Sequence, residues 1–233
     1  MPDAAAAEAA SIAALTLLAS AEVGAVLIGG YAVSSFAFGR TSVDLDMVID
    51  GRKAPLARAL LEASGFALSR ARRLQGGDYA GAFELWRHPS GGRVDLLVGG
   101  VQDRKVGVWM PQGYLAKNSE ERAIRAAFGA PAVRCRVATR ELLIALKLQP
   151  FRLVDRRDIF ALCFDAPDSP ALRRHLDQLG NPILGVRLRR MPAIVEARAF
   201  EDSFKGVYRV VSERILARLK RNLGVLVRET LTD

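Results

Sequence analysis

Two aspartates separated by one residue carry the strongest chemical signal in the sequence. Asp44 and Asp46 lie in residues 42–49, where hydrophobic residues occupy alternate positions. This alternation predicts a β-strand with one face toward a core. Side chains at positions i and i+2 of a strand point to the same face, about 7 Å apart along the chain. The two carboxylates can therefore converge on one or two hard divalent cations.

A third carboxylate would complete a two-metal site, and Asp95 is the best candidate. It lies in the sequence Arg-Val-Asp-Leu-Leu-Val, which has a similar strand character. Neighbouring strands lie about 4.8 Å apart, so carboxylates on two such strands can share metals. Two ions about 3.5–4 Å apart would steady the attacking and the leaving oxygens of a phosphoryl transfer. We expect Mg²⁺, or Mn²⁺ in its place, and three residues that are both catalytic and metal-binding: Asp44, Asp46 and Asp95.

Other assignments of these acidic residues stay open at this point. Asp78 and Glu84 also compete for the position of third carboxylate, although neither has the strand context of Asp95. Paired aspartates at the end of an exposed strand are also common as solvated surface groups.

A glycine pair lies shortly before the two aspartates. Gly29 and Gly30 separate an apolar segment, residues 25–28, from an expected short helix at residues 31–38. Glycine allows the backbone to approach phosphate oxygens closely, and the start of a helix favours negative charge. We therefore expect a triphosphate between this turn and the aspartates. The nucleotide-binding residues expected from this region are Gly29, Gly30, Ser34 and Arg40.

The elements that must position these residues alternate between short helices and short strands in the first half of the chain. The sequence His-Pro-Ser-Gly-Gly predicts a hairpin between residues 82–87 and 93–98. We predict an α+β fold with a mixed sheet and flanking helices in residues 1–115 and a mainly helical domain in residues 116–233. Helices are expected at residues 4–20, 31–38, 55–63, 120–128, 139–149, 154–165, 170–179 and 207–231, and strands at 25–28, 42–49, 82–87, 93–98 and 132–137.

The overall composition is that of an ordinary globular protein with a strongly positive charge. The chain has 233 residues and a net charge of +9. A positive field concentrates phosphate-bearing partners, although a general preference for arginine would explain the charge equally well. Cys135 and Cys163 form no ligand or disulfide pattern, which favours a cytoplasmic location. Glu8 interrupts the apolar start of the chain, so this segment is expected to be a buried helix and not a membrane anchor.

The glycine pair, the short helix and the Asp-x-Asp strand together resemble the signature of nucleotidyltransferases of the DNA polymerase β superfamily. A second segment, residues 141–158, narrows the resemblance to proteins of the AbiEii and MenT type. It reads Glu-Leu-Leu-Ile-Ala-Leu-Lys-Leu-Gln-Pro-Phe-Arg-Leu-Val-Asp-Arg-Arg-Asp. The resemblance implies that Lys147 contacts the triphosphate and that Asp158 helps to shape the nucleotide pocket. Alternatively, Lys147 reaches solvent and Asp158 pairs with Arg156 or Arg157.

The resemblance implies a magnesium-dependent transfer of a nucleotide from an NTP, such as ATP, to an acceptor hydroxyl. Residues 1–115 would then be the catalytic core and residues 116–233 the domain that binds nucleotide and acceptor. Toxin-like relatives imply a tRNA 3′ end as the acceptor and a cognate antitoxin as a partner. A protein or small-molecule acceptor, or a catalytically silent nucleotide- or RNA-binding module, are the alternatives. Basic clusters such as Arg70, Arg72 and Arg73 are candidates for RNA phosphate contacts.

Overall fold

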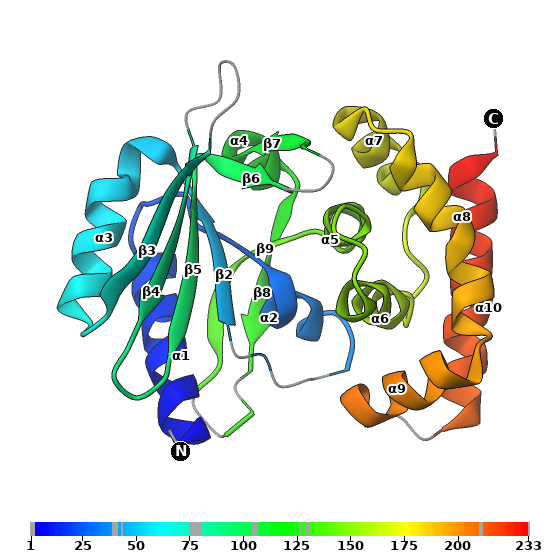
Figure 1. The fold of residues 1–233 in the computed structure, drawn as a ribbon, viewed down its shortest axis with the longest axis horizontal. Coiled ribbons are helices and arrows are strands. Elements are labelled where there is room, and N and C mark those ends of the chain that lie inside the picture. The colour runs from blue at the N-terminus through cyan, green and yellow to red at the C-terminus, as the bar shows by residue number, and fades with distance from the viewer. Residues whose placement is uncertain are drawn as a thin grey trace. The chain divides into compact units, whose positions relative to one another are not determined.

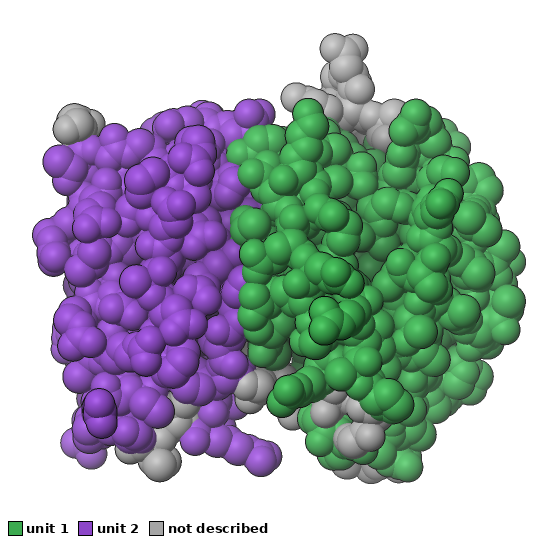
Figure 2. All heavy atoms as spheres, turned by 180° about the vertical axis from the view of Figure 1, so that it is seen from behind, with its two compact units in different colours: residues 1–35, 41–102, 109–139 green, residues 36–40, 103–108, 140–233 purple. Residues whose placement is uncertain are grey.

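The chain forms two compact units. The computed structural model describes residues 3–38, 42, 44–74, 81–103, 107–125, 127, 128, 131–209 and 212–232. Unit 1 consists of Met1–Ser35, Thr41–Gln102 and Trp109–Thr139, and unit 2 of Phe36–Arg40, Asp103–Val108 and Arg140–Asp233 (Figure 2). Within the described residues, every strand belongs to unit 1.

Unit 1 is built on a mixed β-sheet. Its strands are β1 (Val26–Ile28), β2 (Asp44–Ile49), β3 (Ala67–Leu74), β4 (Gly81–Arg87), β5 (Arg93–Val98), β8 (Ser119–Ile124) and β9 (Val133–Ala138). In the described part of the chain they lie in the order β3-β4-β5-β2-β1-β9-β8. Strands β2 and β5 are parallel, as are β1 and β9, and the other neighbours are antiparallel. A small second sheet pairs β6 (Gly100–Gln102) with β7 (Trp109–Pro111).

Alternating burial gives the central strands two different faces. Strand β5 is buried at every second position, and β2 begins with the same alternation. The buried side chains of the core face include Leu45, Met47, Val94 and Leu96. The opposite face carries Asp44, Asp46 and Asp95, and we call it the carboxylate face. Because the core face excludes water, its packing holds the carboxylates of the opposite face at defined positions.

The helices Ala4–Ser20 and Ala54–Ala63 cover the core face of the sheet, whereas the short helix Gly29–Ser34 begins beside the Asp46 carboxylate on the opposite face. The helices of unit 1 are α1 (Ala4–Ser20), α2 (Gly29–Ser34), α3 (Ala54–Ala63) and α4 (Gln112–Lys117), with a 3-10 turn, η1, at Gly51–Lys53. Helix α1 contacts β2, β5 and β9 and also packs on α3 (Figure 1). None of the described helices is both long and apolar enough to cross a membrane.

Unit 2 is helical in its described part. It contains α5 (Arg140–Leu148), α6 (Leu153–Leu162), α7 (Ser169–Leu179), α8 (Ile183–Val195), α9 (Arg198–Tyr208) and α10 (Glu213–Leu231) (Figure 1). Four rings from α6 and α9 pack together in its core, with centroid distances of 4.8 Å for Phe160 to Phe204 and for Phe204 to Tyr208. Aromatic burial of this kind contributes strongly to the packing of a helical unit.

Most expected elements are confirmed to within a few residues, including the predicted α+β class and the hairpin of β4 and β5. The helix expected at residues 120–128 is wrong, because β8 occupies this segment and pairs with β9. Pairing with a neighbouring strand overrides the local helix preference of Glu and Ala. The helix expected at 207–231 is in fact the end of α9 and all of α10, because Arg209 adopts a left-handed conformation with φ 53°. Strand β3 and helix α8 were not expected.

Residues 116–139 were expected in the mainly helical second half of the chain, with one strand at 132–137, but half of the segment is strand. Both β8 and β9 extend the sheet of unit 1, and the Thr139 amide donates to the Asn118 carbonyl at 3.0 Å. Unit 2 therefore resumes only at Arg140, where α5 begins.

Candidate active site

The three predicted carboxylates lie together on the carboxylate face of unit 1. Asp46 of β2 is the register partner of Asp95 of β5, and Asp44 lies two residues before Asp46 on the same face. The predicted adjacency of the two strands is thus confirmed. The Asp44 side chain is 34% exposed and the Asp95 side chain 13% exposed, so both are accessible to a bound ligand.

Gly29 makes room for the Asp46 carboxylate. Ile28 is the register partner of Asp46, which brings the start of α2 against this side chain. A Cβ atom added to Gly29 would overlap the Asp46 carboxylate, 2.6 Å from its Cγ atom. Gly29 also has φ +70°, a conformation that glycine adopts without strain. The structure therefore assigns Gly29 a direct role in shaping the acidic cluster, while its contact with phosphate stays a prediction.

The other residues expected near the glycine pair are placed only in part. Gly30 and Ser34 belong to α2, and the Ser34 hydroxyl donates to the Gly30 carbonyl at 3.1 Å. Arg40 lies outside the described residues, as does Asp78, one of the competing carboxylates.

Glu84, the other competing carboxylate, points away from the cluster. It lies on the core face of β4 and is 3% exposed. Arg58 donates to it at 2.9 Å through Nε, and Trp86 donates through Nε1 at 3.2 Å. Glu84 is therefore a buried structural partner of Arg58, and the preference for Asp95 is supported by its position on the sheet.

Arg93 is a member of the acidic cluster that the sequence did not reveal. It is the register partner of Asp44 and lies two residues before Asp95, so all three side chains share a face. Its Nε atom lies 3.3 Å from Asp44 Oδ1 and 3.2 Å from Asp95 Oδ1, and its Nη2 atom 3.3 Å from Asp95 Oδ2. The i, i+2 spacing to Asp95 was the signal available in the sequence.

Arg93 does not donate a hydrogen bond to every oxygen atom of these carboxylates. Asp44 Oδ1 is buried and has no hydrogen-bond partner, because the 3.3 Å contact with Arg93 lacks the geometry of a hydrogen bond. Burial raises the pKa of Asp95, and the nearby Asp44 charge raises it further, whereas Arg93 opposes both effects. The negative charge of the cluster is thus only partly compensated, which favours the binding of a further cation.

The chemical nature of these groups fits a hard divalent cation. Mg²⁺ prefers oxygen ligands and usually takes one or two protein carboxylates together with phosphates. Asp44, Asp46 and Asp95 supply such oxygens, and Asp44 Oδ1, which forms an ion pair with Arg93 but accepts no hydrogen bond, could accept one. In the arrangement described, no three acidic, histidine or cysteine side chains of the described residues converge closely enough to hold a metal ion.

Lys147 and Asp158, expected to contact the nucleotide, belong to a buried network of unit 2. Lys147 Nζ lies 2.8 Å from Asp158 Oδ2 and 3.5 Å from Asp155 Oδ1. The Tyr208 hydroxyl donates to Asp158 Oδ1 at 2.6 Å, and Arg152 binds Asp155 at 2.8 Å. Both aspartate side chains are fully buried, and Lys147 is 13% exposed. Lys147 therefore has carboxylate partners in place before any ligand is considered.

The alternative pairing of Asp158 with a neighbouring arginine is wrong. Arg156 Nε lies 3.4 Å from the Arg152 carbonyl oxygen, and Arg157 Nε lies 3.4 Å from that of Leu153. Both arginines therefore turn back along their own helix, and the partners of Asp158 among the described contacts include Lys147 and Tyr208.

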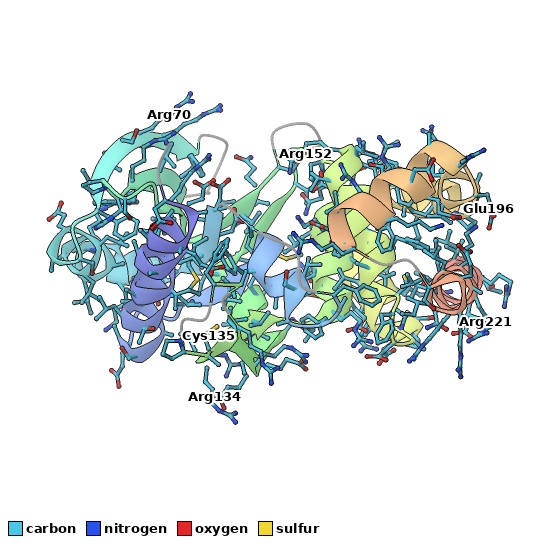
Figure 3. All side chains as sticks on the ribbon, turned by 90° about the horizontal axis from the view of Figure 1, so that it is seen from below. Arg70, Arg134, Cys135, Arg152, Glu196 and Arg221 are labelled. Carbon is cyan, nitrogen blue, oxygen red and sulfur yellow. The ribbon has the colours of Figure 1, made fainter. Side chains whose placement is uncertain are left out.

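Two exposed arginines of the edge strand β3 lie on the carboxylate face, separated from the acidic cluster by one strand. Leu85 of β4 pairs with both Asp95 and Arg70, so Arg70 of the edge strand β3 lies in the same row as Asp46 and Asp95. Arg72 follows two residues later on the same face, and both arginines are exposed. Figure 3 shows Arg70 projecting away from the ribbon. The carboxylate face is therefore acidic at its centre and basic at its edge.

Comparisons with known proteins identify a fold. Neither a family model nor a curated protein matches the sequence. MenT4, a nucleotidyltransferase toxin from Mycobacterium tuberculosis, is similar over 99% of this chain and 85% of that chain, with 21% identity and a TM-score of 0.57. A nucleotidyltransferase-like protein from Paracoccidioides brasiliensis covers 90% and 99% with 18% identity and a TM-score of 0.46. ANT(2″)-Ia in complex with adenylyl-2″-tobramycin covers 74% and 96% with 14% identity and a TM-score of 0.47.

We base the assignment on MenT4, because the other two TM-scores are below 0.5. The chain has the same fold as the MenT4 nucleotidyltransferase toxin.

Proposed function

We propose that this protein transfers a nucleotide from an NTP to an acceptor hydroxyl, with Asp44, Asp46 and Asp95 as the catalytic carboxylates. The observation that carries the proposal is the register pairing of Asp46 with Asp95, beside a glycine whose missing side chain leaves room for Asp46. The acceptor oxygen would attack the α-phosphorus of the NTP, and the bond to the leaving pyrophosphate would break. This reaction is common to enzymes with a carboxylate cluster of this kind.

The carboxylates would hold Mg²⁺ or Mn²⁺. When bound, such ions neutralise phosphate charge and lower the pKa of a coordinated hydroxyl. The protein's own contribution is to hold Asp44, Asp46 and Asp95 at fixed positions through the buried residues that alternate with them. By resemblance, Gly29, Gly30, Ser34 and Arg40 would contact the nucleotide phosphates.

By resemblance, Lys147 would contact the triphosphate and Asp158 would help to shape the nucleotide pocket. The 2.8 Å ion pair places both side chains in one network of unit 2. Lys147→Met is expected to raise the KM for the NTP, whereas Lys205→Met, which removes an ion-paired lysine of α9, is the matched control. A KM that changes equally in both variants would argue against a nucleotide contact by Lys147.

We further propose that the acceptor is an RNA, with a tRNA 3′ end as the specific candidate. The exposed Arg70 and Arg72 on the carboxylate face support a polyanionic acceptor, because phosphate contacts by Arg and Lys supply most of the affinity of nucleic-acid binding. A small-molecule acceptor such as an aminoglycoside, and a protein acceptor, are the alternative transferase functions. The third alternative is a catalytically silent nucleotide- or RNA-binding module. The Asp44 oxygen that accepts no hydrogen bond argues against this alternative, because it could bind a cation.

The decisive experiment is nucleotide labelling with separated acceptor classes. The protein is incubated with labelled NTPs and Mg²⁺ or Mn²⁺, together with total RNA, an aminoglycoside mixture or a protein extract. Label is expected in RNA, and Asp46→Asn should abolish it while circular dichroism shows an intact fold. Asp202→Asn, at a side chain that is 66% exposed, is the control. Label in another acceptor class would correct the substrate, and full labelling by Asp46→Asn would reject the site.

A toxin role with a cognate antitoxin is a finer proposal, which follows from the likeness to the MenT4 toxin. Expression of the protein in a bacterial host should arrest growth, and Asp46→Asn should restore it. Arrest that persists with Asp46→Asn would separate toxicity from nucleotide transfer.

A further inference from the structure

Arg93 holds the two carboxylates that a cation would need. Its Nε atom lies between Asp44 Oδ1 and Asp95 Oδ1, at 3.3 Å and 3.2 Å, and its Nη2 atom contacts the second oxygen of Asp95. Both oxygens of Asp95 are thus engaged by one guanidinium group. Each Asp95 oxygen keeps a second lone pair that could bind a divalent cation, but the positive charge of Arg93 beside it would repel that cation.

The contacts of Arg93 are long for an ion pair of this type. Charge-assisted N–H···O bonds commonly measure about 2.7–2.9 Å, whereas those of Arg93 measure 3.2 Å and 3.3 Å. The Arg93 side chain is also 29% exposed, so water screens the attraction. The attraction between Arg93 and the two carboxylates is therefore modest, and it leaves part of their negative charge uncompensated.

A positive charge is needed in the cluster even in the absence of a metal. Three carboxylates on one face would repel each other at neutral pH. Because Arg93 is the register partner of Asp44, its backbone position is set by the pairing of β2 and β5. Arg93 therefore compensates the negative charge of the carboxylates from a strand position that requires no ordered loop.

We infer that Arg93 is the resident counter-ion of the acidic cluster and that its charge lowers the affinity of Asp44 and Asp95 for a divalent cation. The inference rests on the proposed function, since it concerns the same cation site. Arg93 acts as a positioning residue: it contacts both Asp44 and Asp95, and its positive charge opposes the binding of a second cation beside them.

The test is cation binding in the absence of nucleotide. Isothermal titration with Mn²⁺, and thermal unfolding at increasing Mg²⁺ and Mn²⁺, are measured for the full chain. Arg93→Gln is expected to bind Mn²⁺ about five- to tenfold more tightly, in line with the loss of two partly exposed ion-pair contacts. Without added cation the variant should unfold at a lower temperature than the wild type, and added cation should raise that temperature by more.

Arg87→Gln is the matched control. Arg87 is exposed and is the register partner of Arg93 on β4, so the two substitutions remove the same charge one strand apart. Arg87 acts on Asp95 through its charge alone, whereas Arg93 also donates a hydrogen bond, so the Arg87 variant is expected to change the affinity by less, about twofold. Arg93→Met, which keeps much of the aliphatic stem, replaces Arg93→Gln if the latter does not fold.

The outcomes separate this inference from the proposed function. Equal tightening in Arg87→Gln and Arg93→Gln would show a general charge effect and overturn the role of Arg93. Unchanged or weaker binding by Arg93→Gln, with cation binding by the wild type, would overturn it while leaving the cation site intact. If neither the wild type nor Arg93→Gln binds a cation, the proposed cation dependence fails together with the inference.

Discussion

The Cα atom of Gly29 lies directly against the carboxylate of Asp46. An added Cβ atom would approach Asp46 Cγ to 2.6 Å and Asp46 Cβ to 2.9 Å. Asp46 cannot retreat easily, because it is paired on one side with Ile28 and on the other with Asp95. Any side chain at position 29 must therefore displace the carboxylate that the proposed reaction needs.

Gly29→Ala is accordingly expected to lower kcat/KM for nucleotide transfer by about 10²-fold, the cost of a misplacement of about 1 Å at a reacting centre. The matched control is Gly107→Ala. Gly107 has the same φ of +70°, but an added Cβ would meet no atom within 4 Å in the described structure. Both variants should lose about 1 kcal/mol of stability from the backbone conformation, and only Gly29→Ala should lose activity. Equal activity in the two variants would contradict the role of Gly29.

Replacement of Arg70 and Arg72 by glutamate is expected to weaken RNA binding. Fluorescence anisotropy with a labelled tRNA would show a fall in affinity, and the slope of log affinity against log salt should shrink by about two. The loss should be the same for different RNA sequences, because phosphate contacts carry no sequence information. Arg189 and Arg190, which are exposed on α8, provide a control pair with the same charge change. An equal loss in both pairs would assign binding to net charge alone.

The hydrogen bond from Tyr208 to Asp158 is expected to stabilise unit 2. Tyr208→Phe should lower the free energy of unfolding by about 1.5–3 kcal/mol, as for hydrogen bonds to charged groups. The bond is short, at 2.6 Å, and the acceptor is fully buried. Urea unfolding of both single variants and of the double variant with Asp158→Asn measures the coupling. A coupling energy near zero would show that the bond does not contribute.

His175 is expected to make stability depend on pH. Burial lowers the pKa of His175 to about 4; the nearby Arg174 lowers it further, whereas Asp168 raises it. The unfolded chain then binds a proton near the usual histidine pKa of about 6.5, and the folded chain only near 4. The contribution of neutral His175 to the free energy of unfolding is therefore complete above about pH 6.5 and is lost as the pH falls toward 4. Urea midpoints at pH 7 and pH 4.5 should differ more for the wild type than for His175→Gln; an equal difference would reject the assignment.

Much of unit 1 could be read from local patterns. Alternating residues predicted β2 and β5, and a Gly-containing turn predicted the hairpin of β4 and β5. The same alternation placed Asp44 and Asp46 on one face, because side-chain direction in a strand depends only on sequence parity. The prediction from local patterns was wrong for residues 119–124, because this segment is a strand through its pairing with β9 and not through its own residue types.

The composition of the acidic cluster depended on which strands became neighbours. No local pattern fixes the register of Asp46 opposite Asp95, or brings Arg93 opposite Asp44. Long-range pairing also turned Glu84 to the core face beside Arg58, and folding of unit 2 buried Asp158 against Lys147 and Tyr208. Residue types and spacing therefore indicate which groups can do chemistry, whereas the partners of those groups emerge only when segments distant in sequence pack together.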